Sequence, residues 1–280
     1  MTTTPSLLKS VCSAVPFFAL LSGSASMAAA QQDFRWSGVV PAGQRVEIKG
    51  VFGDVRAEAA SGSEVEVSAV RRAGRQGRVE DVRVETVKHE GGVTICAVYP
   101  TPANARTPNR CTPGDSWPVN NQNNDVRVDF VVRVPRGVHF LGKTVNGDVE
   151  ARSLPANALV SSVNGSLKVS AAGVVEGRTV NGSIEATTGS ANPGRDLEFR
   201  TVNGTITLIV PADFRAQVRA SMLNGGLTSD FPLSIHRSRF VGQSAEGEIG
   251  SGGRMLRLET VNGSIEIRRT GGRAPAATRE

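Results

Sequence analysis

The stretch Thr179-Val180-Asn181-Gly182-Ser183-Ile184 decides the fold, because the chain repeats it. Further copies begin at Thr144, Ser162, Thr201 and Thr260, and a looser one begins at Met222. Most copies follow one another after about twenty residues, the length of one supersecondary unit. The turn residues of the six copies are Asn146 and Gly147, Asn164 and Gly165, Asn181 and Gly182, Asn203 and Gly204, Asn224 and Gly225, and Asn262 and Gly263.

Each copy predicts a turn followed by a strand. Asn and Gly tolerate positive φ at low steric cost, so the chain is expected to turn at both residues. The aliphatic residue before the asparagine, such as Val180, and the one three residues after it, such as Ile184, are expected to build the interior. Polar residues such as Glu185 alternate with them and are expected to face water.

Two geometries fit such a repeat. Asn-Gly between alternating runs favours a meander of β-hairpins. A turn repeated this regularly also fits a coil in which each copy stacks on the last with parallel strands. We favour the coil, because only 5% aromatic residues imply a narrow aliphatic core. The prediction is therefore an all-β, single-domain β-solenoid with its asparagines in a ladder.

Three further segments are interpreted within this scheme. The segment Val51-Phe52-Gly53-Asp54-Val55 resembles a degenerate first copy, and Ala245-Glu246-Gly247-Glu248-Ile249 resembles a worn one. Arg268 and Arg269 lie on the last strand, where they would protect an open sheet edge from further pairing. A monomer is expected on that basis.

The N-terminal residues 1–30 have the pattern of a secretory signal peptide. Lys9 precedes the apolar run from Val15 to Leu21, and small residues up to Ala30 provide a cleavage site. We expect the repeat domain over residues 31–269 and a disordered tail over 270–280. No later apolar run reaches the roughly 20 residues of a membrane span. The mature protein is therefore expected in the periplasm or outside the cell.

Cys96 and Cys111 are the two cysteines after the signal segment. An even pair in an oxidising compartment usually forms a disulfide, so we expect a bond between them. It would close the first half of an irregular Pro/Asn-rich loop, residues 100–124. Trp117, Asn120 and Asn121 in this loop suit either a binding site or a covering insertion, and covering is the favoured interpretation.

The charge pattern argues against nucleic acid as a partner. The net charge is +6, and the basic run from Arg71 to Arg78 could contact an acidic polymer but is better explained as a solvated loop. No aromatic residues accompany these arginines, as stacking on bases would require.

No catalytic residue, metal site or cofactor is predicted. Asp148, Glu150, Glu185 and Glu266 occupy equivalent outward positions of successive copies, so ordinary solvent-facing positions explain them better than an acid and base pair does. The three histidines lie outside any hydrolase or zinc motif. A polysaccharide-modifying enzyme of the parallel β-helix type is kept as the alternative function.

The Val-Asn-Gly-[Asp/Ser]-[Val/Ile] copies, the approach from Val126 to Val138 and the opening from Gly50 to Val55 resemble a known bacterial family. This is the toastrack-like domain of unknown function, whose members are called "putative adhesins". The resemblance covers most of residues 35–269 and implies a β-solenoid of the cell envelope without catalytic residues. The leading hypothesis is accordingly a non-catalytic, adhesin-like binding or structural module with an envelope protein or a glycan as partner.

Overall fold

The computed structural model describes residues 1–2, 34–115, 117–237 and 242–271. The chain separates into two units, Met1–Ala30 and Gln31–Glu280. The expected signal peptide lies almost wholly outside the described residues, as does most of the expected tail. All strands belong to the second unit, whose only helix among the described residues is the short 3₁₀ element η1 (Val79–Asp81).

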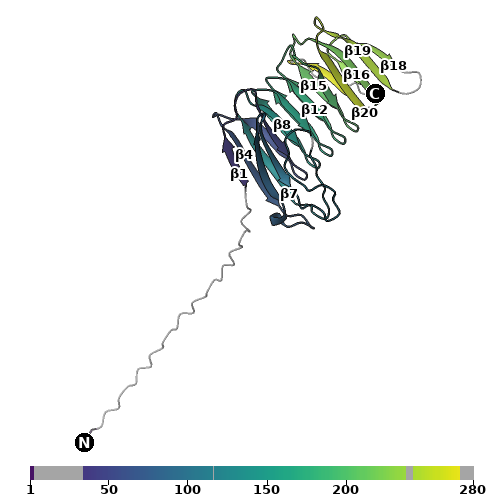
Figure 1. The fold of residues 1–280 in the computed structure, drawn as a ribbon. Coiled ribbons are helices and arrows are strands. Elements are labelled where there is room, and N and C mark those ends of the chain that lie inside the picture. Colours follow the sequence, from purple (N-terminus) through teal and green to yellow (C-terminus); the bar gives the residue numbers. More distant parts are fainter. Residues whose placement is uncertain (3–33, 116, 238–241, 272–280) are drawn as a thin grey trace. The chain divides into compact units, whose positions relative to one another are not determined.

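The strands form two large sheets (Figure 1). The ten-stranded sheet contains, in spatial order, β1 (Phe34–Gly38), β4 (Val65–Arg72), β7 (Arg127–Val134), β3 (Val55–Ala59), β9 (Val149–Leu154), β11 (Leu167–Ala171), β13 (Ile184–Thr188), β15 (Ile206–Val210), β21 (Ile265–Arg269) and β17 (Leu227–Ser229). The eleven-stranded sheet contains β18 (Ser234–Arg237), β19 (Gln243–Ile249), β16 (Ala216–Asn224), β20 (Met255–Asn262), β14 (Leu197–Arg200), β12 (Val175–Arg178), β10 (Ala158–Ser161), β8 (His139–Lys143), β2 (Arg45–Lys49), β6 (Gly92–Val98) and β5 (Arg83–His89).

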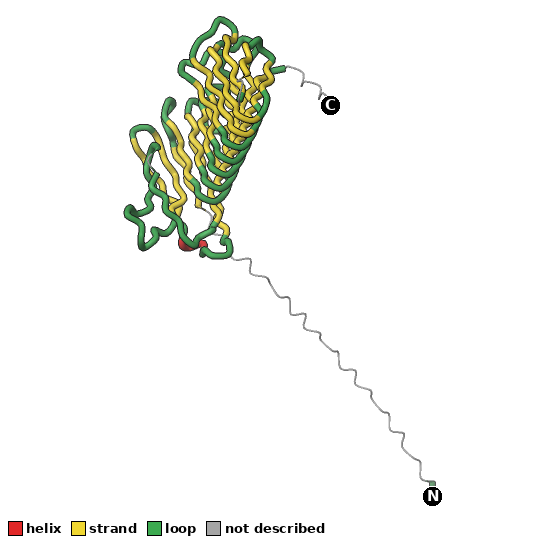
Figure 2. The backbone as a smooth tube through the Cα atoms, turned by 90° about the vertical axis from the view of Figure 1, so that its right-hand side faces the viewer, coloured by secondary structure: helices red, strands yellow, loops and turns green. Residues whose placement is uncertain are grey.

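The repeats alternate between the two sheets. In the copy at Asn181, strand β12 of the eleven-stranded sheet precedes the turn and strand β13 of the ten-stranded sheet follows it. Each strand pairs in parallel with the equivalent strand of the neighbouring copy, for example β11 with β13 and β10 with β12. The Asn-Gly turns therefore do not close hairpins, and they line up in a row along one edge (Figure 2).

The order of the copies departs from the sequence at one end. Phe52, Asn146, Asn164, Asn181 and Asn203 are bridged in chain order, but Asn203 is bridged to Asn262. Asn262 in turn pairs with Asn224, so the sixth copy lies between the fourth and the fifth. This exchange arises because the chain leaves the fifth copy, forms β18 and β19, and returns as β20 between β14 and β16.

Two expectations about this end are wrong. The segment 245–249 belongs to β19, which pairs antiparallel with β16, so it is not a worn copy of the parallel repeat. Strand β21 lies between β15 and β17, so Arg268 and Arg269 do not protect a sheet edge. The guanidinium of Arg269 instead lies 4.9 Å from the ring centre of Phe231.

The core confirms one half of the repeat pattern and corrects the other. The aliphatic residue three positions after the asparagine is buried in most copies, as at Ile184. The aliphatic residue before the asparagine is not: Val163, Val180, Leu223 and Val261 are 36% to 48% exposed. In every copy but the fifth, the preceding residue is a Thr or Ser that turns inward instead, because its hydroxyl finds an acceptor in the turn of the adjacent copy, as Thr179 does at Gly165.

Candidate functional site

The turn edge consists of three hydrogen-bonded ladders that hold the copies in register. In the first ladder, five of the six asparagine side chains donate to the amide oxygen of the asparagine in an adjacent copy at 2.7 to 2.8 Å, and Asn146 at the end only accepts. This confirms the expected asparagine ladder. The asparagine side chains bond to one another and so hold adjacent copies in register.

The glycines are required by close approach of neighbouring backbones. A Cβ on Gly182 would lie 2.1 Å from the carbonyl oxygen of Gly165, and the other turn glycines meet an equivalent oxygen. No turn asparagine has positive φ; among described non-glycine residues only Asn123 and Ser153 do. The expectation of positive φ is therefore wrong for the asparagines, whereas Gly182, Gly204, Gly225 and Gly263 have φ of +148° to +159°. Tight stacking of the copies is a further reason for the glycine.

The second and third ladders use residues that the sequence pattern did not single out. The Thr179 hydroxyl donates to the Gly165 carbonyl at 2.9 Å, and Thr144, Ser162, Thr201 and Thr260 make equivalent bonds. The residue after the glycine forms the third ladder: the Ser166 amide donates to Asp148 Oδ1 at 2.8 Å. The Ser or Thr that precedes the aliphatic residue in five of the six copies was a signal for the buried hydroxyl.

The outer face of the ten-stranded sheet carries three adjoining depressions, which together we call the groove. The depression over the parallel repeats has a volume of about 610 Å³ and is lined by residues from Asp54 and Arg56 to Arg268. A depression of about 230 Å³ shares Arg56 and Glu150 with it. One of about 650 Å³ shares Val131 with the second and reaches Trp36. The groove thus crosses the strands from β1 to β21.

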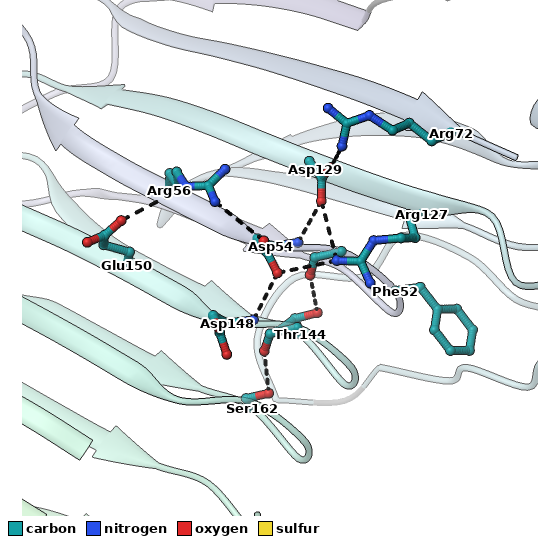
Figure 3. A network of polar contacts seen from close by, with 12 residues as sticks. Phe52, Asp54, Arg56, Arg72, Arg127, Asp129, Thr144, Asp148, Glu150 and Ser162 are labelled. Atoms are coloured by element: carbon teal, nitrogen blue, oxygen red, sulfur yellow. Dashed lines mark hydrogen bonds and ion pairs between the residues drawn. The ribbon is translucent and has the colours of Figure 1, made fainter. Parts of the chain in front are cut away.

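A polar network lies at the middle of the groove, where β7, β3 and β9 meet (Figure 3). Asp54 accepts hydrogen bonds from the Asp148 amide at 3.1 Å and from Arg127 at 3.4 Å. Asp129 accepts one from the Asp54 amide at 2.9 Å and is paired with Arg72. Two carboxylates and several guanidinium groups therefore neutralise one another here.

Three further carboxylates on the outer face of this sheet also have basic neighbours. Glu150 lies 2.5 Å from Arg152, and Glu185 lies 3.1 Å from Lys168 of the adjacent strand. Glu266 lies 2.5 Å from Arg268. Such exposed pairs are worth about 0–1 kcal/mol each and are screened by salt. General acid and base catalysis needs two carboxyl groups that flank one bond. These carboxylates instead form charge pairs spread over a polar surface.

The loop over residues 100–124 covers strands β2 and β6 of the other sheet. Cys96 and Cys111 form the expected disulfide, with Cα atoms 5.4 Å apart. Trp117 is half-buried and packs against the core rather than standing free. The Asn120 amide donates to Asn109 at 2.8 Å and the Asn121 side chain donates to the Asn124 carbonyl at 2.6 Å, so both asparagines stabilise the loop itself.

A buried ion pair fastens this loop, and the sequence did not reveal it. Glu47 and Lys49 of β2 are fully buried and lie 3.3 Å apart. Lys49 Nζ also donates to the carbonyls of Thr112 and Gly114 at 2.6 and 2.5 Å, and Glu47 accepts from the Gly114 amide at 3.0 Å. Burial lowers the pKa of Lys49, while the Glu47 carboxylate opposes that shift. In the sequence both residues occupy outward strand positions, which are normally solvated.

The basic run from Arg71 to Arg78 is folded around Asp125. That carboxylate accepts hydrogen bonds from the backbone amides of Arg75 at 2.7 Å, Gln76 at 2.9 Å and Gly77 at 3.1 Å. These bonds lower the pKa of Asp125, and the bond from the Gln76 amide contributes most. The run is thus an ordered connection between strands.

The described residues contain neither a cluster of metal-binding side chains nor a membrane-spanning helix. Within them, no three His, Cys, Asp or Glu side chains gather closely enough to hold a metal ion. Within the same residues, no helix has the length and apolar character needed to cross a membrane.

Comparison with known proteins gives structural neighbours alone. No family model and no curated protein matches the chain. A "putative cell adhesion protein" from Clostridium sporogenes aligns with 85% of this chain and 100% of its own at 9% identity and a TM-score of 0.44. A "putative adhesin" from Bacteroides fragilis aligns with 86% and 98% at 11% identity and a TM-score of 0.37. One from Parabacteroides distasonis aligns with 85% and 98% at 12% identity and a TM-score of 0.31.

Proposed function

We propose that this chain is a non-catalytic, extracytoplasmic binding module, and that its recognition surface is the groove of the ten-stranded sheet. The observation that carries the proposal is the continuity of the groove, whose three depressions share lining residues from Trp36 to Arg268. A surface of this form suits an extended partner laid across the strands. Residues 31–269 are proposed to be one β-solenoid that keeps this surface rigid.

The arrangement of charge supports binding over catalysis. Glu150 and Glu185 stand on either side of Lys168 in adjacent strands, so positive and negative rungs alternate. Complementary charge patterns of this kind give a partner its register and exclude wrong partners. In the enzyme alternative, two carboxyl groups would have to be free to act on one bond, whereas Glu150 and Glu185 are each paired with a base.

The groove is a better candidate than the loop at Trp117. Trp117 packs against the core, and the amides of Asn120 and Asn121 are engaged within the loop. The loop is also fixed from below by the disulfide and by Lys49. We therefore assign the loop a covering role and leave recognition to the opposite sheet.

The remaining features of the proposal concern location and assembly. A disulfide persists in oxidising compartments, which supports export after cleavage near Ala30. At the end of the stack, Phe231 is buried and Leu233 packs against the core, which supports a capped monomer. Light scattering of the mature chain tests this, and a stable dimer would contradict it.

Cross-linking of the mature protein in intact cells tests the binding role. Wild type is compared with Lys168→Glu, with the exchange Lys168→Glu and Glu185→Lys, and with Trp117→Ala. The exchange keeps the ion pair but reverses the order of charge, so it should lose the captured partner while keeping the stability of wild type. Trp117→Ala should keep the partner. Capture that survives the exchange would exclude the groove as the recognition surface.

A further inference from the structure

We propose that Asn224 is a site of spontaneous covalent modification, and that its deamidation loosens the end of the repeat stack. The site belongs to the Asn-Gly edge and is independent of the groove. Six copies of one reactive dipeptide lie along this edge, and Asn224 belongs to the copy that ends the row. Hydrogen bonds between copies protect the other five and leave this copy open to reaction.

The reaction is the closure of a ring between an asparagine side chain and the next backbone nitrogen. Asn-Gly is especially prone to it, because glycine has no side chain to hinder ring closure. The glycine nitrogen loses its proton and attacks Cγ of the asparagine. The new N–Cγ bond closes a five-membered succinimide, and the side-chain nitrogen leaves as ammonia. Water then opens the ring at either carbonyl, which gives aspartate or isoaspartate, so water is the only other reactant.

Five of the six turn glycines have the attacking nitrogen engaged in a hydrogen bond. The Gly182 amide donates to the Asn203 carbonyl of the adjacent copy at 2.9 Å. Equivalent bonds of 2.8 to 3.0 Å are made by Gly147, Gly165, Gly204 and Gly263. A backbone amide held in this way becomes available only when neighbouring copies separate locally. These bonds therefore slow ring closure in the five copies.

Gly225 lies at the end of the row, where no further copy supplies such an acceptor. Within the part of the chain that the structure describes, its amide has no hydrogen-bond acceptor. Gly225 is also exposed, whereas the other five turn glycines are partly buried. A Cβ on Gly225 would lie 1.9 Å from the Gly263 carbonyl oxygen, but no other turn glycine stacks on its opposite face. Its nitrogen is therefore open to the solvent base that starts the reaction.

The Asn224 side chain is also the less restrained partner for this attack. Its Nδ2 donates to Asn262 Oδ1 at 2.8 Å. In an internal copy the amide oxygen is held as well, since Asn181 Oδ1 accepts from Asn203 Nδ2 at 2.7 Å. Among the described residues, Asn224 Oδ1 has no such donor. A single side-chain hydrogen bond thus restrains the Cγ that the Gly225 nitrogen must reach.

Deamidation would remove the last rung of the asparagine ladder. A carboxylate has no N–H to donate, so the product would turn an acceptor toward Asn262 Oδ1. Isoaspartate also inserts a methylene into the backbone between β16 and β17. On one side of this point the Gly263 amide donates to the Asn224 carbonyl at 2.8 Å, and on the other Leu227 pairs with Ile265. Both contacts depend on the original length of the backbone, so β17 should separate from β21.

Peptide mapping measures the rate of reaction at each copy. The mature protein is incubated in heavy-oxygen water at mildly alkaline pH, and the label that enters each Asn-Gly peptide is followed by mass spectrometry. Asn224 should take up label about tenfold faster than the other five asparagines, which react only through local opening. In urea all six should react at similar rates, because no copy is then protected. This control corrects for differences in neighbouring sequence.

Variants test the consequence for the stack. Asn224→Asp carries the charge of one product and should lower the melting temperature by about 2–4 °C, as the loss of one hydrogen bond would. Wild type should show a similar decline as the site reacts. Asn224→Gln should show no decline with time, because its longer side chain closes a ring far more slowly. The inference falls if Asn224 reacts no faster than the internal copies in the folded protein, or if neither reaction nor Asn224→Asp lowers the melting temperature.

Discussion

The Asn-Gly edge and the loop over β2 both hide polar groups from water, but they satisfy those groups in different ways. At the edge, the same amide bond of 2.7 to 2.8 Å recurs from copy to copy. Under the loop, Lys49 combines one carboxylate and two backbone carbonyls in an arrangement that occurs once among the described residues. The edge spreads its stabilisation over many equal bonds, whereas the loop concentrates it at one buried charge.

Removing that charge should give the largest effect. Lys49→Met leaves Glu47 buried without its counter-charge and should lower the free energy of unfolding by about 3–5 kcal/mol. Lys143→Met is the matched control, because its partner Asp115 is fully exposed and the pair is worth about 0–1 kcal/mol. Urea unfolding with the disulfide intact measures both.

A second variant checks the cause. Adding Glu47→Leu to Lys49→Met should recover part of the loss, because replacing both charges with apolar groups removes the unpaired carboxylate. Recovery will be incomplete, since Gly114 loses its bond to Glu47. If Lys49→Met proves as mild as Lys143→Met, the two regions do not differ in the way described.

The edge should break by crowding rather than by loss of charge. A Val side chain at Gly182 places a Cβ 2.1 Å from the Gly165 carbonyl oxygen, so neighbouring copies must separate. Such overpacking costs about 1–3 kcal/mol. Gly194→Val is the control, because no atom lies within 4 Å of its added Cβ. Equal melting temperatures for the two variants would mean that copies at the edge are not tightly stacked.

The same contrast explains what the sequence could and could not predict. Asn181 and Gly182 repeat in six copies, so their ladder and the all-β parallel arrangement follow from local pattern. Thr179 and its equivalents also recur from copy to copy. A Thr at this position fits an exposed strand residue equally well, so the sequence did not predict its buried hydroxyl. Lys49 has no counterpart in other copies, and its burial depends on a loop more than sixty residues later.

From the sequence, only the outward face of the sheet that carries the groove could be predicted. Outward positions such as Glu150, Lys168 and Glu185 follow from strand alternation, which places them on one side of the sheet. That β1 extends this face beyond the repeats, with Arg35 beside Ser68, depends on β1 pairing with β4, and on β4 pairing with β7. Those pairings are antiparallel and lie outside the repeats, so the repeat pattern contained no information about them. The exchange of the fifth and sixth copies was hidden for the same reason.

The smallest effect near neutral pH is expected at Tyr99. Its side chain contacts both regions, the loop and the Asn-Gly edge. Its hydroxyl donates to the Val126 carbonyl at 2.5 Å beside the loop and accepts from the Phe52 amide at 3.4 Å in the first copy. The ring also meets Phe52 edge to face. Burial raises the pKa of Tyr99 well above its usual 10.0, because the tyrosinate form is poorly solvated there.

The sign of the pH effect follows from this shift. Above pH 10 the unfolded chain releases the tyrosine proton while the folded chain retains it, so stability that is complete at lower pH falls by about 1.4 kcal/mol per pH unit. Tyr99 is the only tyrosine in the chain, so tyrosinate absorbance reports it alone. Native protein should stay protonated at a pH where urea-unfolded protein has titrated, and Tyr99→Phe should remove this part of the alkaline decline. A native titration near 10 would show that Tyr99 is open to solvent, and that the loop and the first copy are not joined through it.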